Sequence, residues 1–179
     1  MMNRTAGFVF AVALAVSLAG CTYRSNLLRS VHEVGVTRNR PASTIGGGED
    51  TQEILWRVYQ VDLNPSAVRH LLMYGPTLHL IASDCDGRNE FAWEDIYVGG
   101  ATLNGSSGER ASANLIDAAI RKGGGRLMGI SYLRDQDVRD RREFCLEAHG
   151  GREIGLGFTS NAVKISSTDT LSSVASKTR

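Results

Sequence analysis

The chain has 179 residues, of which 42% are apolar and 22% are charged, close to the averages for a folded protein and unlike the charge-rich composition of disordered chains. Its 20 basic residues nearly balance its 19 acidic residues, so the net charge of +1 gives no field that would attract nucleic acid. These values predict one folded domain with no nucleic-acid partner.

The N-terminus has the pattern of an export signal. Arg4 precedes an almost wholly apolar run over residues 6–20, and small residues lead up to Cys21. The run is shorter than the roughly 20 apolar residues that cross a bilayer as a helix. Leu18-Ala19-Gly20-Cys21 resembles the lipobox of bacterial lipoproteins. The resemblance implies that residues 1–20 are removed as a signal peptide and that Cys21 carries diacylglycerol and a further acyl chain such as palmitate, the alternative being a secreted protein with a chance cysteine.

The lipobox also implies a location. Each buried CH₂ of an acyl chain contributes about 0.8 kcal/mol, so two or three chains hold a protein on its membrane essentially permanently. Lipoproteins that stay at the inner membrane commonly carry aspartate after the cysteine, and this chain has Thr22 there. The resemblance therefore implies the periplasmic face of the outer membrane, with the inner membrane as the alternative.

Residues 21–50 are predicted to be a lipidated N-terminus and a flexible tether, because they are rich in arginine, contain Gly46-Gly47-Gly48 and have little apolar spacing. A flexible chain of that length spans roughly 30 Å. The arginines are expected either to be solvated or to lie on anionic lipid headgroups. A single globular domain is predicted over residues 51–166, followed by a loose C-terminal tail over residues 167–179.

The first half of the domain predicts strands on either side of a short helix. Residues 54–63 are rich in β-branched and aromatic side chains and favour a strand. Asn64-Pro65 then supplies a capping residue and a favoured first helical residue, and Gly75-Pro76 ends the helix. Further strands are expected at residues 77–83 and 91–98.

The second half predicts the longest helix and a series of strands. Ser106-Ser107-Gly108-Glu109 has the spacing of a helix start, and Gly123-Gly124-Gly125 ends the apolar stripe that follows. Residues 134–142 are charged and favour an exposed turn or hairpin. The remaining strands are expected at residues 127–133, 144–148, 152–158 and 162–165, with Gly150-Gly151 forming a hairpin turn. The fold class is therefore α+β, a mainly antiparallel sheet with one principal helix packed on it.

Cys85 and Cys145 are the two cysteines that remain once Cys21 carries lipid. In an oxidising periplasm, an even pair in a small domain indicates a disulfide. It would close a loop of about 60 residues, which the chain-entropy relation values at roughly 4 kcal/mol. A redox-active pair is the alternative, although neither cysteine lies in a Cys-x-x-Cys motif.

No motif predicts catalysis or a cofactor. Gly123-Gly124-Gly125 follows a predicted helix and precedes a strand, whereas a phosphate loop follows a strand and opens a helix. The acidic residues at 84–90 favour an exposed turn, with a calcium site as the weaker alternative. His70, His79 and His149 have no ligand spacing. We therefore expect no catalytic residue, no metal ligand and no cofactor, and a protein that is not an enzyme.

The stretch from Cys85 to Cys145 also resembles the small domain of RcsF-type envelope-stress lipoproteins. The resemblance is carried by a cysteine at a strand end, an Ala- and Leu-containing helix over residues 111–125, an apolar strand at 127–130 and a later cysteine before a glycine-rich strand. Members of that family typically have four domain cysteines and a proline-rich tether, whereas this chain has two domain cysteines and only Pro41 in its linker. The family's signalling role is therefore transferred to no residue here.

Two classes of function fit the sequence. The first is a membrane-anchored protein-interaction module whose partner is an unidentified envelope or toxin protein, which makes the chain an envelope machine component, a sensor, or an immunity or inhibitor protein. Aromatic and arginine residues dominate many protein interfaces. The candidate partner surface is Trp93, Tyr97, Arg134, Arg139, Arg141 and Arg142. The alternative is a periplasmic hydrolase or a small-ligand-binding lipoprotein.

Overall fold

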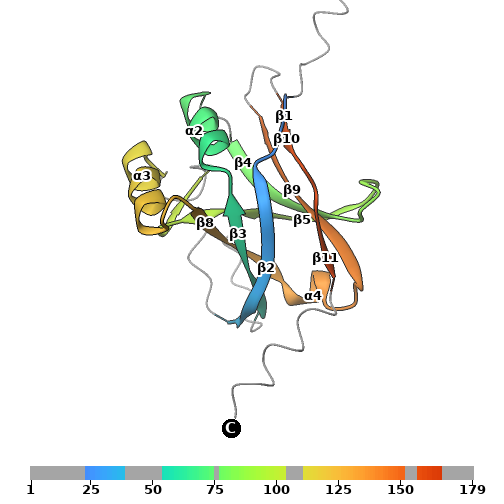
Figure 1. The fold of residues 1–179 in the computed structure, drawn as a ribbon. Helices are drawn as coiled ribbons and strands as arrows, with labels where there is room; N and C mark the ends of the chain where they lie inside the picture. The colour runs from blue at the N-terminus through green and yellow to red at the C-terminus, as the bar shows by residue number, and fades with distance from the viewer. Residues whose placement is uncertain (1–22, 39–53, 75–76, 104–110, 152–156, 167–179) are drawn as a thin grey trace, which may run out of the picture.

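The computed structural model describes residues 23–38, 54–74, 77–103, 111–151 and 157–166. Strands predominate in this part of the chain and form two sheets that enclose the core, with two helices across one end (Figure 1). The predicted α+β fold with mainly antiparallel pairing is confirmed. The structure corrects the finer arrangement, since there are two sheets rather than one and two helices of ten residues rather than one principal helix.

The first sheet, sheet A, is built around strand β9. Its strands in spatial order are β1 (Tyr23–Ser25), β10 (Gly157–Ser160), β9 (Glu143–Gly151), β4 (Thr77–Ser83) and β5 (Glu90–Asp95), and β11 (Val163–Ser166) pairs with β9 beside β10. All pairs are antiparallel except β1 with β10. Strand β9 therefore has β4 along one edge and both β10 and β11 along the other.

The second sheet, sheet B, follows the order β2, β3, β8, β6 and β7. Its strands are β2 (Leu28–Thr37), β3 (Trp56–Leu63), β8 (Leu127–Arg134), β6 (Tyr97–Val98) and β7 (Ala101–Thr102). The chain passes from sheet A to sheet B at the fully buried Ile96, between β5 and β6. The predicted single strand over residues 91–98 is therefore divided between the two sheets.

The core lies between the inward faces of the two sheets. Side chains alternate along a strand, so Tyr59, Val61 and Leu63 of β3 point to the same side and are fully buried. Leu80 of β4 and Leu146 of β9 belong to the same buried cluster from the side of sheet A. A short helix, α4 (Asp135–Val138), follows β8 and adds Val138 to this cluster.

The two longer helices, α2 (Pro65–Tyr74) and α3 (Ala113–Lys122), lie beside each other at one end of the molecule (Figure 1). Helix α2 begins as the sequence predicts, because the Asn64 side chain accepts the Ser66 N–H at 3.1 Å. Ser112 caps α3 by accepting the Leu115 N–H. An ion pair of 2.7 Å between Arg69 and Asp117 joins the exposed sides of the two helices.

The structure corrects the predicted tether over residues 21–50. Residues 23–25 and 28–37 form β1 and β2, and Leu27, Leu28 and Val31 are buried in the core. The strand pattern is weak in the sequence because β2 is the outer strand of sheet B and exposes Val34 and Val36. The rest of the predicted tether from residue 39, the signal peptide with Cys21, and the tail over 167–179 lie outside the described residues.

Three further element boundaries differ from the prediction. Helix α3 begins at Ala113 rather than after Ser106, and residues 104–110 lie outside the described residues. Gly150 and Gly151 are paired residues of β9 rather than a turn. The predicted exposed turn over residues 134–142 contains α4, whose first backbone N–H, that of Asp135, donates to the Leu55 carbonyl. Each difference reflects pairing with a segment distant in sequence, which a local pattern does not encode.

Candidate functional site

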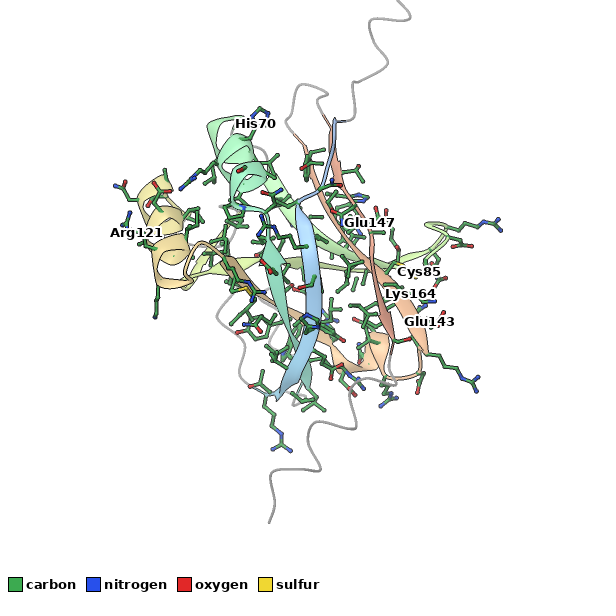
Figure 2. The ribbon with its side chains drawn as sticks, viewed as in Figure 1. His70, Cys85, Arg121, Glu143, Glu147 and Lys164 are labelled. Atoms are coloured by element: carbon green, nitrogen blue, oxygen red, sulfur yellow. A yellow bond between two sulfur atoms is a disulfide. The ribbon has the colours of Figure 1, made fainter. Side chains whose placement is uncertain are left out.

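The outward surface of sheet A carries an ordered grid of side chains. Leu78, Leu80 and Ala82 point into the core, so the alternate residues of β4 face outward. The strand register places a residue of β9 and a residue of β5 on either side of each of them. The three rows are Glu147–Ile81–Trp93, His149–His79–Asp95 and Cys145–Ser83–Glu90. We call these nine residues the β5–β4–β9 face; Figure 2 labels Glu147 on it.

Trp93 is the main exposed aromatic side chain of this face. It is 58% exposed, and its indole N–H donates to the Glu90 carboxylate at 3.1 Å. Ile81, directly opposite Trp93, is only 1% exposed, although it lies on the outward side of the sheet. The tryptophan is thus held by a hydrogen bond at its edge and packed at its base, while most of its surface stays open to solvent.

Two histidines lie directly opposite each other on β4 and β9, each next to a carboxylate. His149 Nε2 is 3.1 Å from Glu147 Oε2, and His79 Nδ1 is 3.5 Å from Asp95 Oδ1. The His79 ring centroid is 6.1 Å from that of Trp93. Carboxylates at these distances orient the two imidazoles, so this part of the face has a defined hydrogen-bonding pattern.

The disulfide between Cys85 and Cys145 closes one corner of the face. The pairing predicted from the sequence is present, with a Cα–Cα distance of 4.8 Å, and it ties the turn after β4 to β9. In that turn Asp84 accepts from Arg141 at 2.7 Å, and Asp86 accepts the Arg88 N–H at 3.1 Å. The acidic residues of this turn are therefore engaged in contacts that hold it together.

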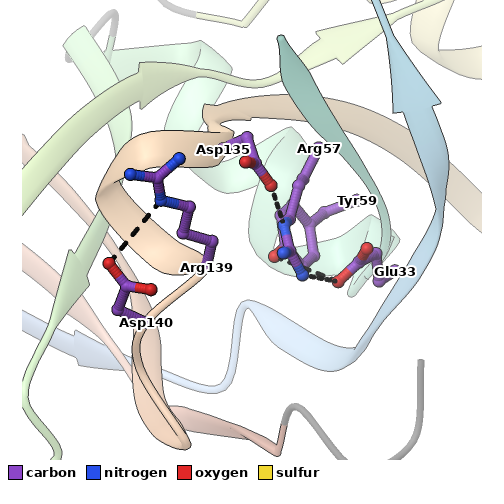
Figure 3. Close-up of polar contacts among 6 residues, drawn as sticks. All are labelled: Glu33, Arg57, Tyr59, Asp135, Arg139 and Asp140. Carbon is purple, nitrogen blue, oxygen red and sulfur yellow. Dashed lines mark hydrogen bonds and ion pairs between the residues drawn. The ribbon is translucent and has the colours of Figure 1, made fainter. Parts of the chain in front are cut away.

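A second polar group, the Arg57 cluster, lies where β2, β3 and α4 meet (Figure 3). The Arg57 Nε donates to Asp135 at 2.7 Å, and Arg57 Nη1 lies 3.4 Å from Glu33 Oε2. The Tyr59 hydroxyl also donates to Glu33 at 3.4 Å. We define the Arg57 cluster as these four residues.

Electrostatics in the Arg57 cluster favour a charged arginine and a neutral tyrosine. Burial acts to lower the pKa of Arg57, but the hydrogen bond to Asp135 and the charges of Glu33 and Asp135 outweigh it and raise the pKa above its usual value. Burial, and then the negative charge of Glu33, raise the pKa of Tyr59 well above that of a free tyrosine. The cluster is an internally balanced group that joins β2 and α4 to β3.

The structure does not gather the six predicted surface residues onto one surface. Trp93 is exposed as expected, but the prediction for Tyr97 is wrong: it is 6% exposed, and its ring packs edge-on against Tyr132 at 5.7 Å. Arg134 lies in sheet B with its guanidinium 5.9 Å from the Trp56 ring.

The remaining three arginines border the turn between α4 and β9. Arg141 stacks on the Phe91 ring at 3.6 Å and donates to Asp84, so it is part of the fold. Arg139 pairs with Asp140 at 3.6 Å (Figure 3), and Arg142 is exposed. Of the six predicted residues, Trp93 alone belongs to the β5–β4–β9 face.

Sequence reasoning missed Glu90, Glu147 and the two opposed histidines. The alternation over residues 77–83 already placed His79 on the side opposite Leu78 and Leu80. It did not reveal which strand lies beside β4, because β4 and β9 are separated by about 60 residues. The register between distant strands is what brings these side chains together.

Two other features were considered as sites. Val68, Leu71, Leu72, Leu78 and Leu103 line a recess of about 230 Å³, counting its open mouth, beside α2. This recess has no titratable lining residue. Within the described residues, no group of three or more His, Cys, Asp or Glu side chains is placed to hold a metal ion. No helix described here is long and apolar enough to span a bilayer.

Comparison with known proteins gave no match to a protein-family profile, to a curated protein or to a solved structure. The lipobox and the resemblance to RcsF-type lipoproteins therefore stay predictions from the sequence.

Proposed function

We propose that this protein is a lipid-anchored lipoprotein of the bacterial envelope whose domain binds another protein through the β5–β4–β9 face. The observation that carries the proposal is Trp93, which is 58% exposed on a flat sheet surface. Tryptophan is the residue most enriched among those that dominate protein interfaces. Its fixed edge, bonded to Glu90, means that little side-chain entropy is lost when a partner covers it.

The anchoring part of the proposal rests on the lipobox and is supported by the disulfide. A bond between Cys85 and Cys145 fits an oxidising compartment such as the periplasm. Strand β1 begins at Tyr23, two residues after Cys21. Two residues span at most about 7 Å, so lipid on Cys21 would hold the domain directly at the bilayer surface rather than on a long tether. The proposed partner therefore lies at the surface of the outer membrane, or of the inner membrane if sorting differs.

The proposed partner is an envelope or toxin protein, and the chain is accordingly a machine component, a sensor, or an immunity or inhibitor protein. The recess beside α2 does not favour the alternative of a hydrolase, because its five lining side chains are apolar and supply neither nucleophile nor base. The opposed histidines are oriented by carboxylates on an open sheet surface rather than within a cleft. A non-catalytic role is thus the simpler proposal.

Crosslinking in living cells tests the binding proposal. A photoreactive amino acid at position 93 should give a discrete adduct, identifiable by mass spectrometry. Ile130 is a matched control, because it is 40% exposed on the outward side of the other sheet. Adducts of equal yield from both positions, or none from position 93, would contradict the proposal.

Lipidation is tested separately. In cells fed a fatty-acid probe, the wild-type chain should be labelled and its Cys21→Ser variant should not. The variant should also accumulate as an uncleaved or soluble species. Equal labelling of the two proteins would refute the anchor while leaving the binding face to be judged by crosslinking.

A further inference from the structure

We infer that the β5–β4–β9 face recognises a basic segment of its partner, with lysine or arginine side chains placed over Trp93 and between Glu90 and Glu147. This inference rests on the proposed binding function and names the chemistry of the partner. It follows from charge, from the contacts of the two glutamates and from the position of the exposed indole.

The face is acidic on a molecule that is nearly neutral. Glu90, Asp95 and Glu147 are among its nine outward residues, and none of the nine is lysine or arginine. The whole chain, by contrast, has 20 basic and 19 acidic residues. Negative charge is therefore concentrated on this surface rather than spread evenly, which favours a partner of opposite sign.

The basic residues that border the face are paired with carboxylates outside it. Lys164, opposite Cys145 on the neighbouring strand, pairs with Glu143 at 2.7 Å (Figure 2), and Arg88 pairs with Asp86 at 3.3 Å. Glu90 instead accepts the neutral indole N–H, and Glu147 contacts the His149 imidazole. The two glutamates thus keep acceptor capacity for a cation supplied by a partner.

The geometry of the three strands suits a basic side chain. Trp93 and Glu147 lie in one row on either side of Ile81, two strand spacings apart, which is about 10 Å. A guanidinium or ammonium group over an exposed indole gains cation–π attraction, and a neighbouring carboxylate adds a charge-assisted hydrogen bond. Residues two apart in an extended segment project to the same side about 7 Å apart, so Arg-x-Arg or Lys-x-Lys can reach both glutamates.

Peptide binding tests the inference with the full chain in a nonionic detergent. The probe is a fluorescent nonapeptide with arginine at alternate positions, and its control has glutamine at those positions. We expect anisotropy to report binding of the arginine peptide, about tenfold weaker binding to the double variant Glu90→Gln/Glu147→Gln, and about fivefold weaker binding to Trp93→Ala. Binding should also weaken as salt rises from about 0.05 to 0.5 M.

Asp140→Asn is the matched control, because it removes the same charge from an exposed side chain paired with Arg139, away from the face. Its affinity should stay within about twofold of wild type. Equal binding of the glutamine peptide, or unchanged binding by the double glutamate variant, would overturn the inference. Self-association of the chain lost in the same double variant would also overturn it, since the basic residues would then come from a second copy.

The in-cell adduct separates this inference from the proposed function. If the position-93 adduct disappears in the Glu90→Gln/Glu147→Gln background and persists with Asp140→Asn, both stand. If the adduct persists in the double variant, the binding face stands and the basic partner does not. If wild-type cells give no adduct but the purified chain discriminates the two peptides as expected, the proposed envelope partner falls and the chemical preference of the face stands.

Discussion

The Arg57 cluster and the β5–β4–β9 face each contain carboxylates beside an aromatic side chain, and they differ in whether the chain itself supplies the cation. In the cluster, Arg57 bonds to Asp135 and lies beside Glu33, whose side chain is 9% exposed. On the face, Glu90 and Glu147 contact an indole and an imidazole instead. A buried carboxylate without a partner costs several kcal/mol, whereas an exposed one is stabilised by water until a ligand replaces that water.

This difference separates residues that stabilise the fold from residues available for binding. Removing part of the cluster should lower the free energy of unfolding and leave the face intact. Changes on the face should leave stability nearly unaltered and alter partner binding. Four variants test that separation, beginning with the disulfide at the corner of the face.

Replacement of both Cys85 and Cys145 by serine should have the largest effect. The disulfide closes a separation of 60 residues, so the chain-entropy relation predicts a loss of about 4 kcal/mol in the free energy of unfolding. Denaturant unfolding without reductant measures the loss, and wild type with reductant should fall by the same amount. Stoichiometric alkylation of both thiols in protein isolated from the periplasm would show that the bond does not form in the cell.

Arg57→Met should reduce the free energy of unfolding by about 2–3 kcal/mol, because it leaves Glu33 and Asp135 without their cation in a largely enclosed site. Arg69→Met is the matched control, since the pair with Asp117 is about half exposed and should contribute less than about 1 kcal/mol. Equal losses in the two variants would show that the cluster is no more structural than a surface pair. Crosslinking from position 93 should persist in both variants.

Tyr59→Phe should cost about 1 kcal/mol at neutral pH, through loss of the hydrogen bond to Glu33. The raised pKa of Tyr59 means that the folded state holds this proton when the unfolded state has released it. The stability due to this group is therefore complete below the unfolded tyrosine pKa of about 10 and is lost as pH rises above it. Unfolding at pH 8 to 11 should show the advantage of wild type over Tyr59→Phe shrinking; a constant difference would contradict the shift.

Trp93→Ala should have the smallest effect on stability, within about 0.5 kcal/mol, because the side chain is mostly solvated. Its effect on affinity for the arginine nonapeptide should nevertheless exceed that of Arg57→Met. Thermal unfolding of the purified chain, compared with anisotropy on the same sample, measures both quantities. A loss above about 2 kcal/mol would place Trp93 with the structural residues of the cluster.

Much of the fold could be read from local sequence pattern. The Asn64-Pro65 helix start and the strand at residues 77–83 agree with the structure, and the glycines after Lys122 end α3 as expected. The two cysteines were paired by compartment and parity alone. These features depend on short-range chemistry, namely caps, period-two alternation and an even number of cysteines.

Tertiary structure alone decided the register between distant strands and the surroundings of each side chain. The sequence named Trp93 and Tyr97 together as surface aromatics, but the turn at Ile96 sends one to an exposed face of sheet A and buries the other in sheet B. It assigned residues 28–37 to a tether because an outer strand buries few side chains and so leaves a weak pattern. Glu90 and Glu147 became neighbours of one face because β4 pairs with both β5 and β9, and a cross-strand register is set by packing of the whole core rather than by any local segment.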